Sequence, residues 1–334
     1  MEILNPRTLK AQAAARQTEQ HRSPRRLALI HAGVIFLALM AVSGINYYVN
    51  QKMNTATGLS GMGMLSVLET VQTVLGYALN LALPFWQMGF VFAALRMARR
   101  EQVGTASLAE GFRRFGPVLR LMLLRGLMYG GLFTACVYVG VIIYVLTPLA
   151  WPLMDLLQPL METGQSTEQV LELFWQLPEQ QIAAAIAPAF IIVIPVCLLV
   201  MLPVYYRFRL ADLVIMDQPA TRAFAALRIS STLTRNRRMA LLRLDLSFWW
   251  YFLLQLVGIL VSDLELLPLD LGIPGLVTYA LGAAVQMAAF WFAGSYFHTT
   301  WAVAYDQLLR QPIPVPQPKA APQNIPWDDY HSEN

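Results

Sequence analysis

The stretch at residues 235–250, "RNRRMALLRLDLSFWW", changes from basic to apolar along its length. Four arginines lie in its first nine residues, and it ends in Phe248, Trp249 and Trp250, with Asp245 at the junction. Arginine side chains favour the headgroup region of a bilayer, and tryptophan favours the interface between headgroups and hydrocarbon. The stretch therefore predicts a position at which the chain enters a membrane.

The composition of the whole chain supports a membrane location. The 334 residues are 57% hydrophobic and only 13% charged, whereas soluble domains carry about 25% charged residues. The remaining charge is too small to cover the surface of a soluble protein of this length. The apolar residues also gather in runs of the length that a bilayer core requires. We therefore expect an all-α integral membrane protein.

Six apolar runs are long enough to span a bilayer as helices. We place these spans at about residues 27–49, 70–95, 121–147, 182–206, 246–262 and 276–303. The fifth is short, and residues 239–245 can extend it as an interfacial turn. The chain is then divided into a basic amino-terminal segment at 1–26, a six-span membrane domain at 27–306 and a Pro-rich, disordered tail at 307–334.

Basic residues occur in alternate segments between these spans. The amino-terminal segment holds six, the connection at 96–125 holds seven, the connection at 207–243 holds eight and the carboxyl tail holds two, which leaves only Lys52 elsewhere. The positive-inside rule assigns such segments to the cytoplasm, so both termini are predicted to be cytoplasmic.

Further helices are predicted outside the spans. The basic segments have partly amphipathic sequences, and each leads into an outgoing span, which divides the membrane domain into three similar helical hairpins. Between spans three and four, "STEQVLELFWQL" at 166–177 combines capping-box spacing with an apolar stripe. This segment predicts a helix on the outer surface of the membrane.

Motifs for catalysis and for metal or cofactor binding are absent from the sequence. There is no HExxH, CxxC pair, Walker loop or dinucleotide fingerprint. We therefore expect no enzyme activity, no metal and no cofactor. For an enzyme acting on lipid, the candidate carboxylates on the cytoplasmic side would be Asp212, Asp217 and Asp245. The net charge of +4 comes from segments that flank spans, so it does not indicate nucleic-acid binding.

The polar residues inside the spans are mostly neutral amides. Among them, Asn80, Gln255 and Gln286 lie in spans two, five and six. Their default role is hydrogen bonding between helices, and the alternative is a polar cavity, which would favour transport. In span three, "GLMYG" at 126–130 has the GxxxG spacing that can seat a close helix contact.

The arginine-rich part of the opening stretch is the strongest candidate for a binding surface. Each basic residue near an anionic leaflet contributes about 1 kcal/mol to membrane association. The candidate residues for binding lipid headgroups or a partner are Arg228, Arg235, Arg237, Arg238, Arg243 and Asp245. Asp245 lies at the membrane boundary, where ionisation is costly without a partner, so we expect Arg207 or Arg209 to pair with it.

Several segments carry a family resemblance. "PVYYRFRLADLVIMDQP" ends a span with proline and tyrosines, and "ALRISSTLTRNRRMALLRLDLSFWW" is similar to a pattern "AL..S..LMKGNK..LF.L.LSFIGW". In the core of the pattern, "LTRNRR" replaces "LMKGNK", so the glycine is absent and only the basic, Asn-containing character is kept. Together with the opening "LKAQAAARQ" and the closing "TTWAVAYDQL", they resemble the bacterial membrane family called domain of unknown function 975. The resemblance implies a multi-span protein of the bacterial cytoplasmic membrane and does not imply an activity.

Two classes of function remain open. The first is a non-enzymatic scaffold or accessory protein, whose cytoplasmic basic helices engage anionic lipid headgroups, a membrane-protein partner or a second copy of the chain. The second is a small transporter or channel with a polar cavity between three helical hairpins. We favour the first, because the sequence has three basic clusters next to spans and few polar residues within the spans.

Overall fold

The computed structural model describes residues 4–21, 23–55, 59–161, 176–262 and 275–311, and every regular element in them is a helix. This confirms the predicted all-α class. Five helices are long and apolar enough to cross a membrane, and a sixth span is present if two bent helices are taken together. Most of the predicted outer helix at 166–177 and of the carboxyl tail lies outside the described residues.

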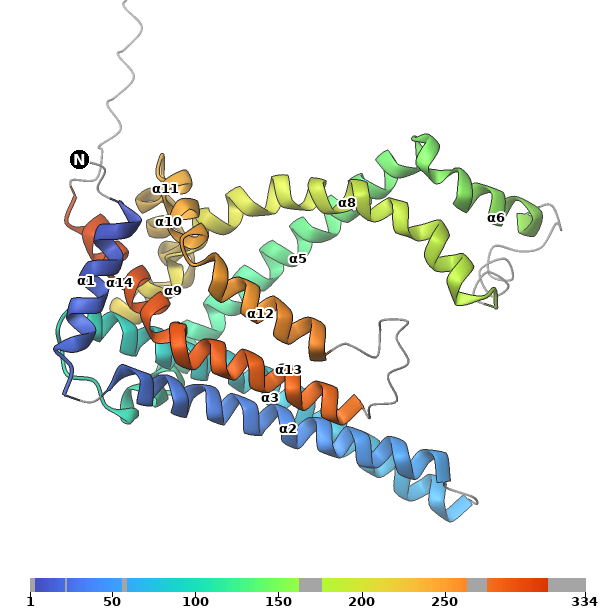
Figure 1. The fold of residues 1–334 in the computed structure, drawn as a ribbon, viewed down its shortest axis with the longest axis horizontal. Helices are drawn as coiled ribbons and strands as arrows, with labels where there is room; N and C mark the ends of the chain where they lie inside the picture. Colours follow the sequence, from blue (N-terminus) through green and yellow to red (C-terminus); the bar gives the residue numbers. More distant parts are fainter. Residues whose placement is uncertain (1–3, 22, 56–58, 162–175, 263–274, 312–334) are drawn as a thin grey trace, which may run out of the picture.

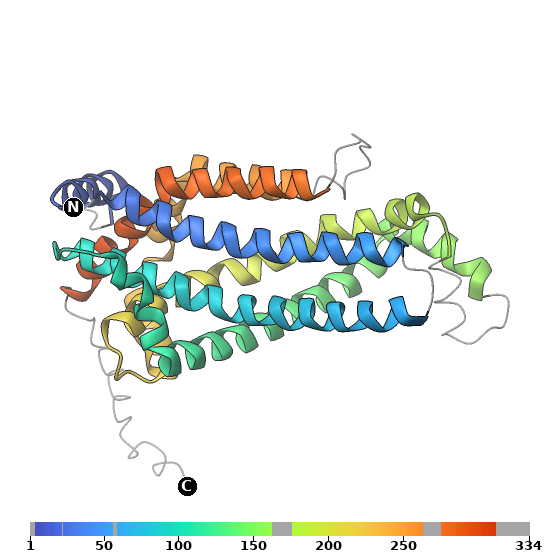
Figure 2. The same ribbon diagram turned by 90° about the horizontal axis from the view of Figure 1, so that it is seen from below.

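The long helices form three pairs, as the order of the predicted spans suggests (Figures 1 and 2). The pairs are α2 (Pro24–Thr55) with α3 (Leu59–Ala98), α5 (Phe115–Val145) with α8 (Glu179–Phe208), and α12 (Trp249–Ser262) with α13 (Gly275–Ala289). Two short helices, η2 (Pro148–Ala150) and α6 (Trp151–Met161), follow α5. In Figure 1 the α5–α8 pair diverges from the other two pairs toward the right of the view.

Shorter helices gather where the three pairs converge, at the left of Figures 1 and 2. We call this group the base. It comprises α1 (Pro6–Thr18), η1 (Thr105–Ala109), α4 (Glu110–Arg113), α9 (Ala211–Asp217), α10 (Ala223–Leu233), α11 (Arg238–Leu246) and α14 (Ser295–Leu309). A π-helical segment, η4 (Phe290–Gly294), joins α13 to α14.

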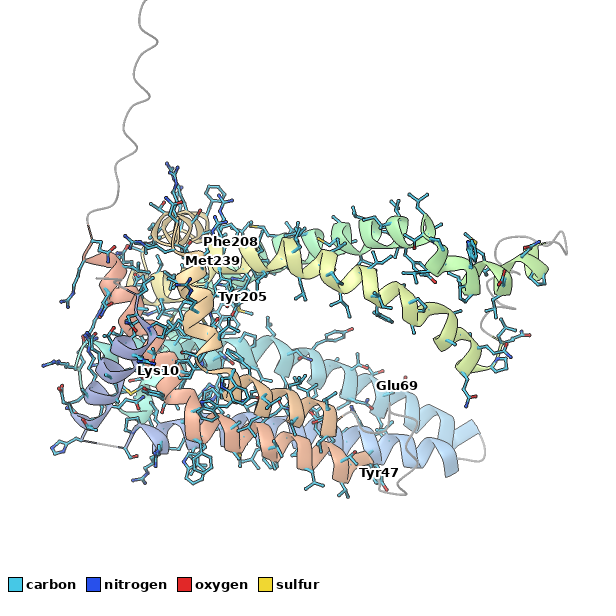
Figure 3. All side chains as sticks on the ribbon, turned by 45° about the horizontal axis from the view of Figure 1, so that its top comes forward. Lys10, Tyr47, Glu69, Tyr205, Phe208 and Met239 are labelled. Carbon is cyan, nitrogen blue, oxygen red and sulfur yellow. The ribbon has the colours of Figure 1, made fainter. Side chains whose placement is uncertain are left out.

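Apolar side chains are buried in the base and exposed on the far parts of the long helices. Leu9 of α1, Val214 of α9 and Tyr305 of α14 are completely buried in one continuous cluster. By contrast, Tyr77 of α3 is 73% exposed and Leu199 of α8 is 78% exposed. Such exposure is costly in water and stable in lipid. The pattern fits hairpins whose outer surfaces contact lipid; Figure 3 shows Lys10 in the base, with Tyr47 and Glu69 far from it.

The amino-terminal helix α1 belongs to the base. Its start is set locally, because Asn5 Oδ1 accepts the backbone N–H of Arg7 at 3.0 Å and Pro6 occupies the first turn. The helix then packs against α14, where Gln17 Nε2 donates to Thr299 Oγ1 at 3.0 Å.

The chain bends by 66° between α11 and α12. The 14 residues of α12 extend about 21 Å at 1.5 Å per residue, less than the roughly 30 Å of a bilayer core. The predicted span at 246–262 is therefore one straight helix only from Trp249 onward. Lys10 of α1 donates to the backbone oxygen of Ser247 at the bend, and its ammonium lies 3.9 Å from the ring centroid of Phe248. Burial at this contact lowers the pKa of Lys10.

Close helix approach occurs at glycines other than those predicted. A Cβ added at Gly126 or Gly130 would meet no heavy atom within 4 Å, so the close contact expected for 126–130 is wrong. A Cβ added at Gly282 of α13 would instead overlap the backbone oxygen of Gly258 in α12. The α12–α13 pair is therefore a contact that requires glycine, because only a residue without a Cβ allows the two backbones to approach this closely.

Candidate functional site

The predicted basic residues lie on α10, on α11 and in the turn between them. Their exposure differs: Arg228, Arg235 and Arg243 are exposed, and Arg237 and Arg238 are half-buried. The turn contains Asn236 in the left-handed conformation, with a φ of 60°, which asparagine adopts more readily than most residues. This turn joins the end of α10 to the start of α11, so that the basic residues of both helices follow one another within the base.

Exposed apolar side chains accompany these arginines on the same helices. Phe224 of α10 is 72% exposed, Met239 of α11 is 71% exposed, and Trp249 at the start of α12 is 63% exposed. The opposite faces are buried, since Leu227 and Leu241 belong to the core. Helices that combine arginine with large apolar side chains on one surface are suited to the boundary between headgroups and hydrocarbon. We call the exposed side of α10 and α11 the basic surface.

Asp245 does not belong to the basic surface, because its side chain is buried. The carboxylate accepts hydrogen bonds from Tyr206 Oη at 2.9 Å and from Trp301 Nε1 at 2.8 Å. The contacts therefore differ from the expected ion pair. Arg207 donates to Ser231 Oγ at 2.8 Å, and Arg209 lies 4.9 Å from the ring centroid of Trp301. The α11 helix presents Asp245 to α8 and α14, where two neutral donors meet the carboxylate.

The other two acids considered for lipid chemistry are engaged in ion pairs. Asp217 of α9 contacts Arg99 at 2.6 Å, and the same guanidinium contacts Asp306 of α14 at 3.3 Å. The hydrogen bond to Asp217 raises the pKa of Arg99. Asp212 pairs with Arg125 of α5 at 3.0 Å. Asp217 thus connects α9 with α14 through Arg99, and Asp212 connects α9 with α5. These ion pairs hold the base and the hairpins together.

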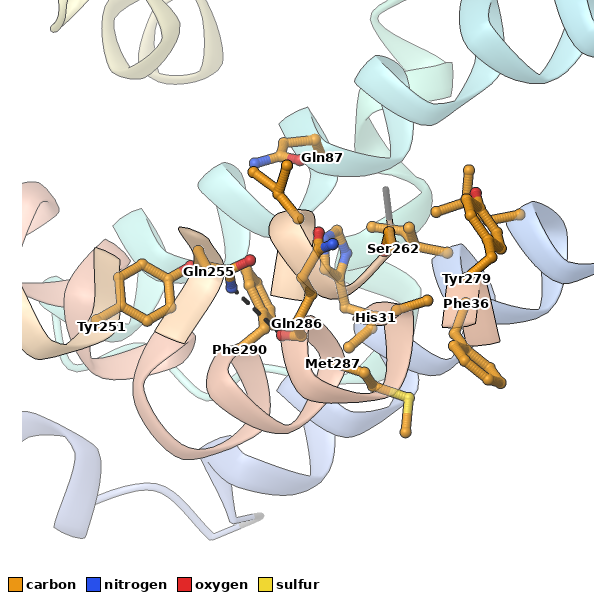
Figure 4. Close-up of a pocket in the computed structure, with 15 residues that line it drawn as sticks. His31, Phe36, Gln87, Tyr251, Gln255, Ser262, Tyr279, Gln286, Met287 and Phe290 are labelled. Atoms are coloured by element: carbon orange, nitrogen blue, oxygen red, sulfur yellow. Dashed lines mark hydrogen bonds between the residues drawn. The ribbon is translucent and has the colours of Figure 1, made fainter. Parts of the chain in front are cut away.

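A cavity of about 430 Å³ lies between the α2–α3 and α12–α13 pairs and η4 (Figure 4). Gln255 of α12 and Gln286 of α13 both line it, as the cavity alternative requires. Asn80 does not line it: its side chain is exposed on α3 and donates to the backbone oxygen of Gly76 at 2.9 Å. The lining residues come from two hairpins, whereas the expectation was three.

The cavity also contains two polar residues of the spans that were not among the three amides expected to line it. Gln87 of α3 lines it, and so does His31 of α2, which is completely buried. Neither ring nitrogen of His31 has a hydrogen-bond partner. Its ring centroid lies 4.6 Å from that of Phe90 and 5.1 Å from that of Phe290. Both polar residues are visible in the sequence as breaks in apolar runs, but nothing there brings them together with the glutamines.

The α12–α13 contact positions the two glutamines. A Cβ at Gly258 would lie 2.5 Å from the Cγ of Gln286, so glycine at this position leaves room for that side chain. Across the same contact, Gln255 Nε2 donates to the backbone oxygen of Gln286 at 3.3 Å. Figure 4 shows Gln255, Gln286 and His31 close together in the middle of the cavity. Three of the polar side chains of the cavity, Gln255, Gln286 and His31, therefore lie close together.

The described helices are those of a multi-pass membrane protein, with five apolar helices of spanning length and one bent pair. No protein-family model, no curated protein and no solved structure matches the chain. The resemblance to the domain of unknown function 975 family therefore stays a prediction.

Proposed function

We propose that this protein is a non-enzymatic membrane scaffold or accessory protein whose basic surface binds anionic lipid headgroups. In this proposal the chain crosses the bacterial cytoplasmic membrane six times, with both termini and the base on the cytoplasmic side. The bent α11–α12 pair supplies the fifth span, with α11 in the interface. The concentration of arginine in and around the base supports this orientation.

The observation that carries the proposal is the pairing of exposed arginines with exposed apolar side chains on α10 and α11. Two other exposed arginines differ from these because they have acidic partners: Arg100 contacts Glu19 at 3.6 Å and Arg113 contacts Glu110 at 3.4 Å. Cations above inserted apolar side chains attract anionic headgroups, and the attraction weakens as salt screens it.

The orientation can be tested by cysteine labelling in intact cells. With Cys136 and Cys197 replaced by serine, Arg235→Cys should react with a membrane-impermeant maleimide only after the membrane is opened. Gln180→Cys, at the start of α8, should react in intact cells because it lies at the other end of the hairpin. Labelling of Arg235→Cys in intact cells would contradict the proposed topology.

The lipid proposal predicts a loss of affinity for phosphatidylglycerol in the double variant Arg228→Gln/Arg235→Gln. At about 1 kcal/mol for each basic residue, the binding constant should fall about 30-fold. Native mass spectrometry of the full chain, titrated with phosphatidylglycerol and separately with phosphatidylcholine, measures this. Binding of phosphatidylglycerol by the unaltered chain should also weaken as the salt concentration rises.

The matched control removes the same charge from a different part of the base. Arg100→Gln/Arg113→Gln replaces two exposed arginines that already have acidic partners, and it should change phosphatidylglycerol affinity by less than about threefold. Equal binding of both lipids by the unaltered chain, or equal losses in the two double variants, would sink the proposal. Unchanged lipid binding with loss of a co-purifying membrane protein would assign the surface to a partner.

Transport is a second candidate, and the cavity beside Gln255 and Gln286 is the observation that favours it. The cavity lies among apolar helices of spanning length, which is where small transporters bind their substrates. Transport requires that the cavity bind a molecule. If no molecule binds in the cavity, the transport function is ruled out.

A further inference from the structure

We propose that the cavity between the α2–α3 and α12–α13 pairs binds an uncharged amphiphile with a hydroxyl- or amide-bearing head group and an apolar chain. This site is separate from the basic surface, and it goes beyond the lipid-surface proposal. Each of the two can fail without the other. The inference holds whether the bound molecule is moved across the membrane or retained.

The lining of the cavity excludes a charged ligand. Among the residues that the structure describes, no Asp, Glu, Lys or Arg lines it. An ion placed there would lose its hydration and gain no opposite charge, which is strongly unfavourable. Charged side chains do lie nearby, since Arg209 and Asp212 line a separate pocket of about 80 Å³. That pocket shares only Gln87 with the cavity.

His31 indicates where the head group binds. Both of its ring nitrogens are buried without a partner, and burying such groups unpaired costs free energy that a hydrogen-bonding ligand would recover. Neighbouring rings hold the imidazole in place, because Phe90 and Phe290 both pack against it. A neutral imidazole offers one donor and one acceptor, which suits a hydroxyl or an amide.

The two glutamines, Gln255 and Gln286, add hydrogen-bonding groups for the same head group. Gln255 is oriented by its hydrogen bond to the backbone of Gln286, and the side-chain amide of Gln286 faces the middle of the cavity beside His31 (Figure 4). Primary amides donate and accept hydrogen bonds. Their combination with His31 therefore favours a head group that also does both, and disfavours one that only accepts.

The remaining walls suit an apolar chain. Ile35 and Leu39 of α2, Ile259 of α12 and Met287 of α13 also line the cavity. Its volume of about 430 Å³ falls within the range of small-molecule sites, roughly 300–1,000 Å³. A cluster of His31 and two glutamines in a lining that also holds several large apolar side chains suits an amphiphile.

The π-helical segment is an independent sign of function at this place. Phe290 begins η4 and lines the cavity. Single π-helical turns inside α-helices are rare and occur frequently at functional sites. Here the segment brings the Phe290 ring against His31, with 5.1 Å between the centroids. The irregular backbone and the unpartnered histidine thus belong to the same site.

The experiment uses the full chain in nanodiscs of phosphatidylcholine and two photoreactive probes. One is a monoacylglycerol with a diazirine in its acyl chain, and the other is the lysophosphatidic acid with the same chain. The neutral probe should crosslink to peptides of α12 and α13, and unlabelled monoacylglycerol should compete. The charged probe should crosslink to these peptides at least about tenfold less, because the lining offers it no cation.

Three variants locate the head group. His31→Phe preserves an aromatic ring and Gln286→Leu preserves the size of the side chain, and each should lower crosslinking of the neutral probe by about tenfold through loss of a hydrogen bond. Asn80→Leu is the matched control, since it removes an amide from an exposed position on α3, and it should leave crosslinking unchanged. Gel filtration of each variant establishes that it is folded.

The outcomes decide both the site and the source of the ligand. Monoacylglycerol should compete while free glycerol at the same concentration should not, because the apolar chain contributes to binding. Equal competition by free glycerol would overturn the proposal of an amphiphile. Equal crosslinking of the unaltered chain by the charged and the neutral probe would by itself overturn the proposal. Full crosslinking in both His31→Phe and Gln286→Leu, or an equal loss in Asn80→Leu, would also overturn it.

Discussion

Replacing Gly89 by alanine is expected to disrupt the packing of α3 against the base. A Cβ at this position would overlap the backbone oxygen of Leu108 in η1. The neighbouring atom is backbone, so it cannot be relieved by a change of side-chain rotamer. Overpacking typically costs 1–3 kcal/mol, and we expect a loss of about 3 kcal/mol or more in the free energy of unfolding at Gly89 because the obstacle is rigid. Thermal denaturation of the protein in nanodiscs, followed by circular dichroism, measures the change.

The control for Gly89→Ala is the same substitution at Gly130. There, an added Cβ meets nothing within 4 Å, and alanine is a better helix former than glycine by about 1 kcal/mol. Gly130→Ala should therefore leave the melting temperature unchanged or raise it. A loss of similar size at both positions would contradict the contact with Leu108 as the cause of the destabilisation.

Asp245→Ala is expected to have the second large effect, by destabilising the junction of α8, α11 and α14. The substitution leaves two buried donors, Tyr206 Oη and Trp301 Nε1, without their acceptor. A buried donor left unpaired costs about 1–3 kcal/mol, so the two together predict a loss of about 2–4 kcal/mol in the free energy of unfolding. Chemical denaturation monitored by tryptophan fluorescence measures this loss.

Asp245→Asn separates hydrogen bonding from charge. The amide oxygen of asparagine can still accept one of the two hydrogen bonds, so this variant should lose clearly less stability than Asp245→Ala. If both variants were equally unstable, the negative charge near Arg209 would be the important property of Asp245, and the two neutral donors would be secondary. Retention of full stability in Asp245→Ala would contradict the hydrogen bonds as the source of stability.

The sequence predicted the pieces of the cavity better than their assembly. Gln255 and Gln286 were identified because an amide in an apolar run is unusual, and both line the cavity. Asn80 has the same chemistry and lies elsewhere. Most of the long helices are apolar on all sides, so hydropathy does not show which side of α3 faces another helix and which faces outward. The same ambiguity concealed the role of His31.

The stretch at residues 235–250 shows, at Asp245, how far contacts can be predicted from the sequence. Its change from arginine to tryptophan predicted a membrane boundary, and α11 ends there in a 66° bend before α12 begins. The expectation that a basic residue would pair with Asp245 rested on the cost of a buried charge. That reasoning identified the need for partners, but Tyr206 and Trp301 are remote in the chain, and any pair of donors would meet the same need.

By itself, the sequence determined that the chain is helical, that it has spans of membrane length, and where arginines flank them. These properties depend on the local transfer of apolar and charged residues between water and lipid, which composition over some twenty residues controls. Only the tertiary structure decided that Gly258 and Gly282, rather than Gly126 and Gly130, lie at a close contact, and that His31 meets two glutamines. Helices within lipid associate through small residues and specific packing instead of one apolar face, so their rotation is set by partners distant in the chain.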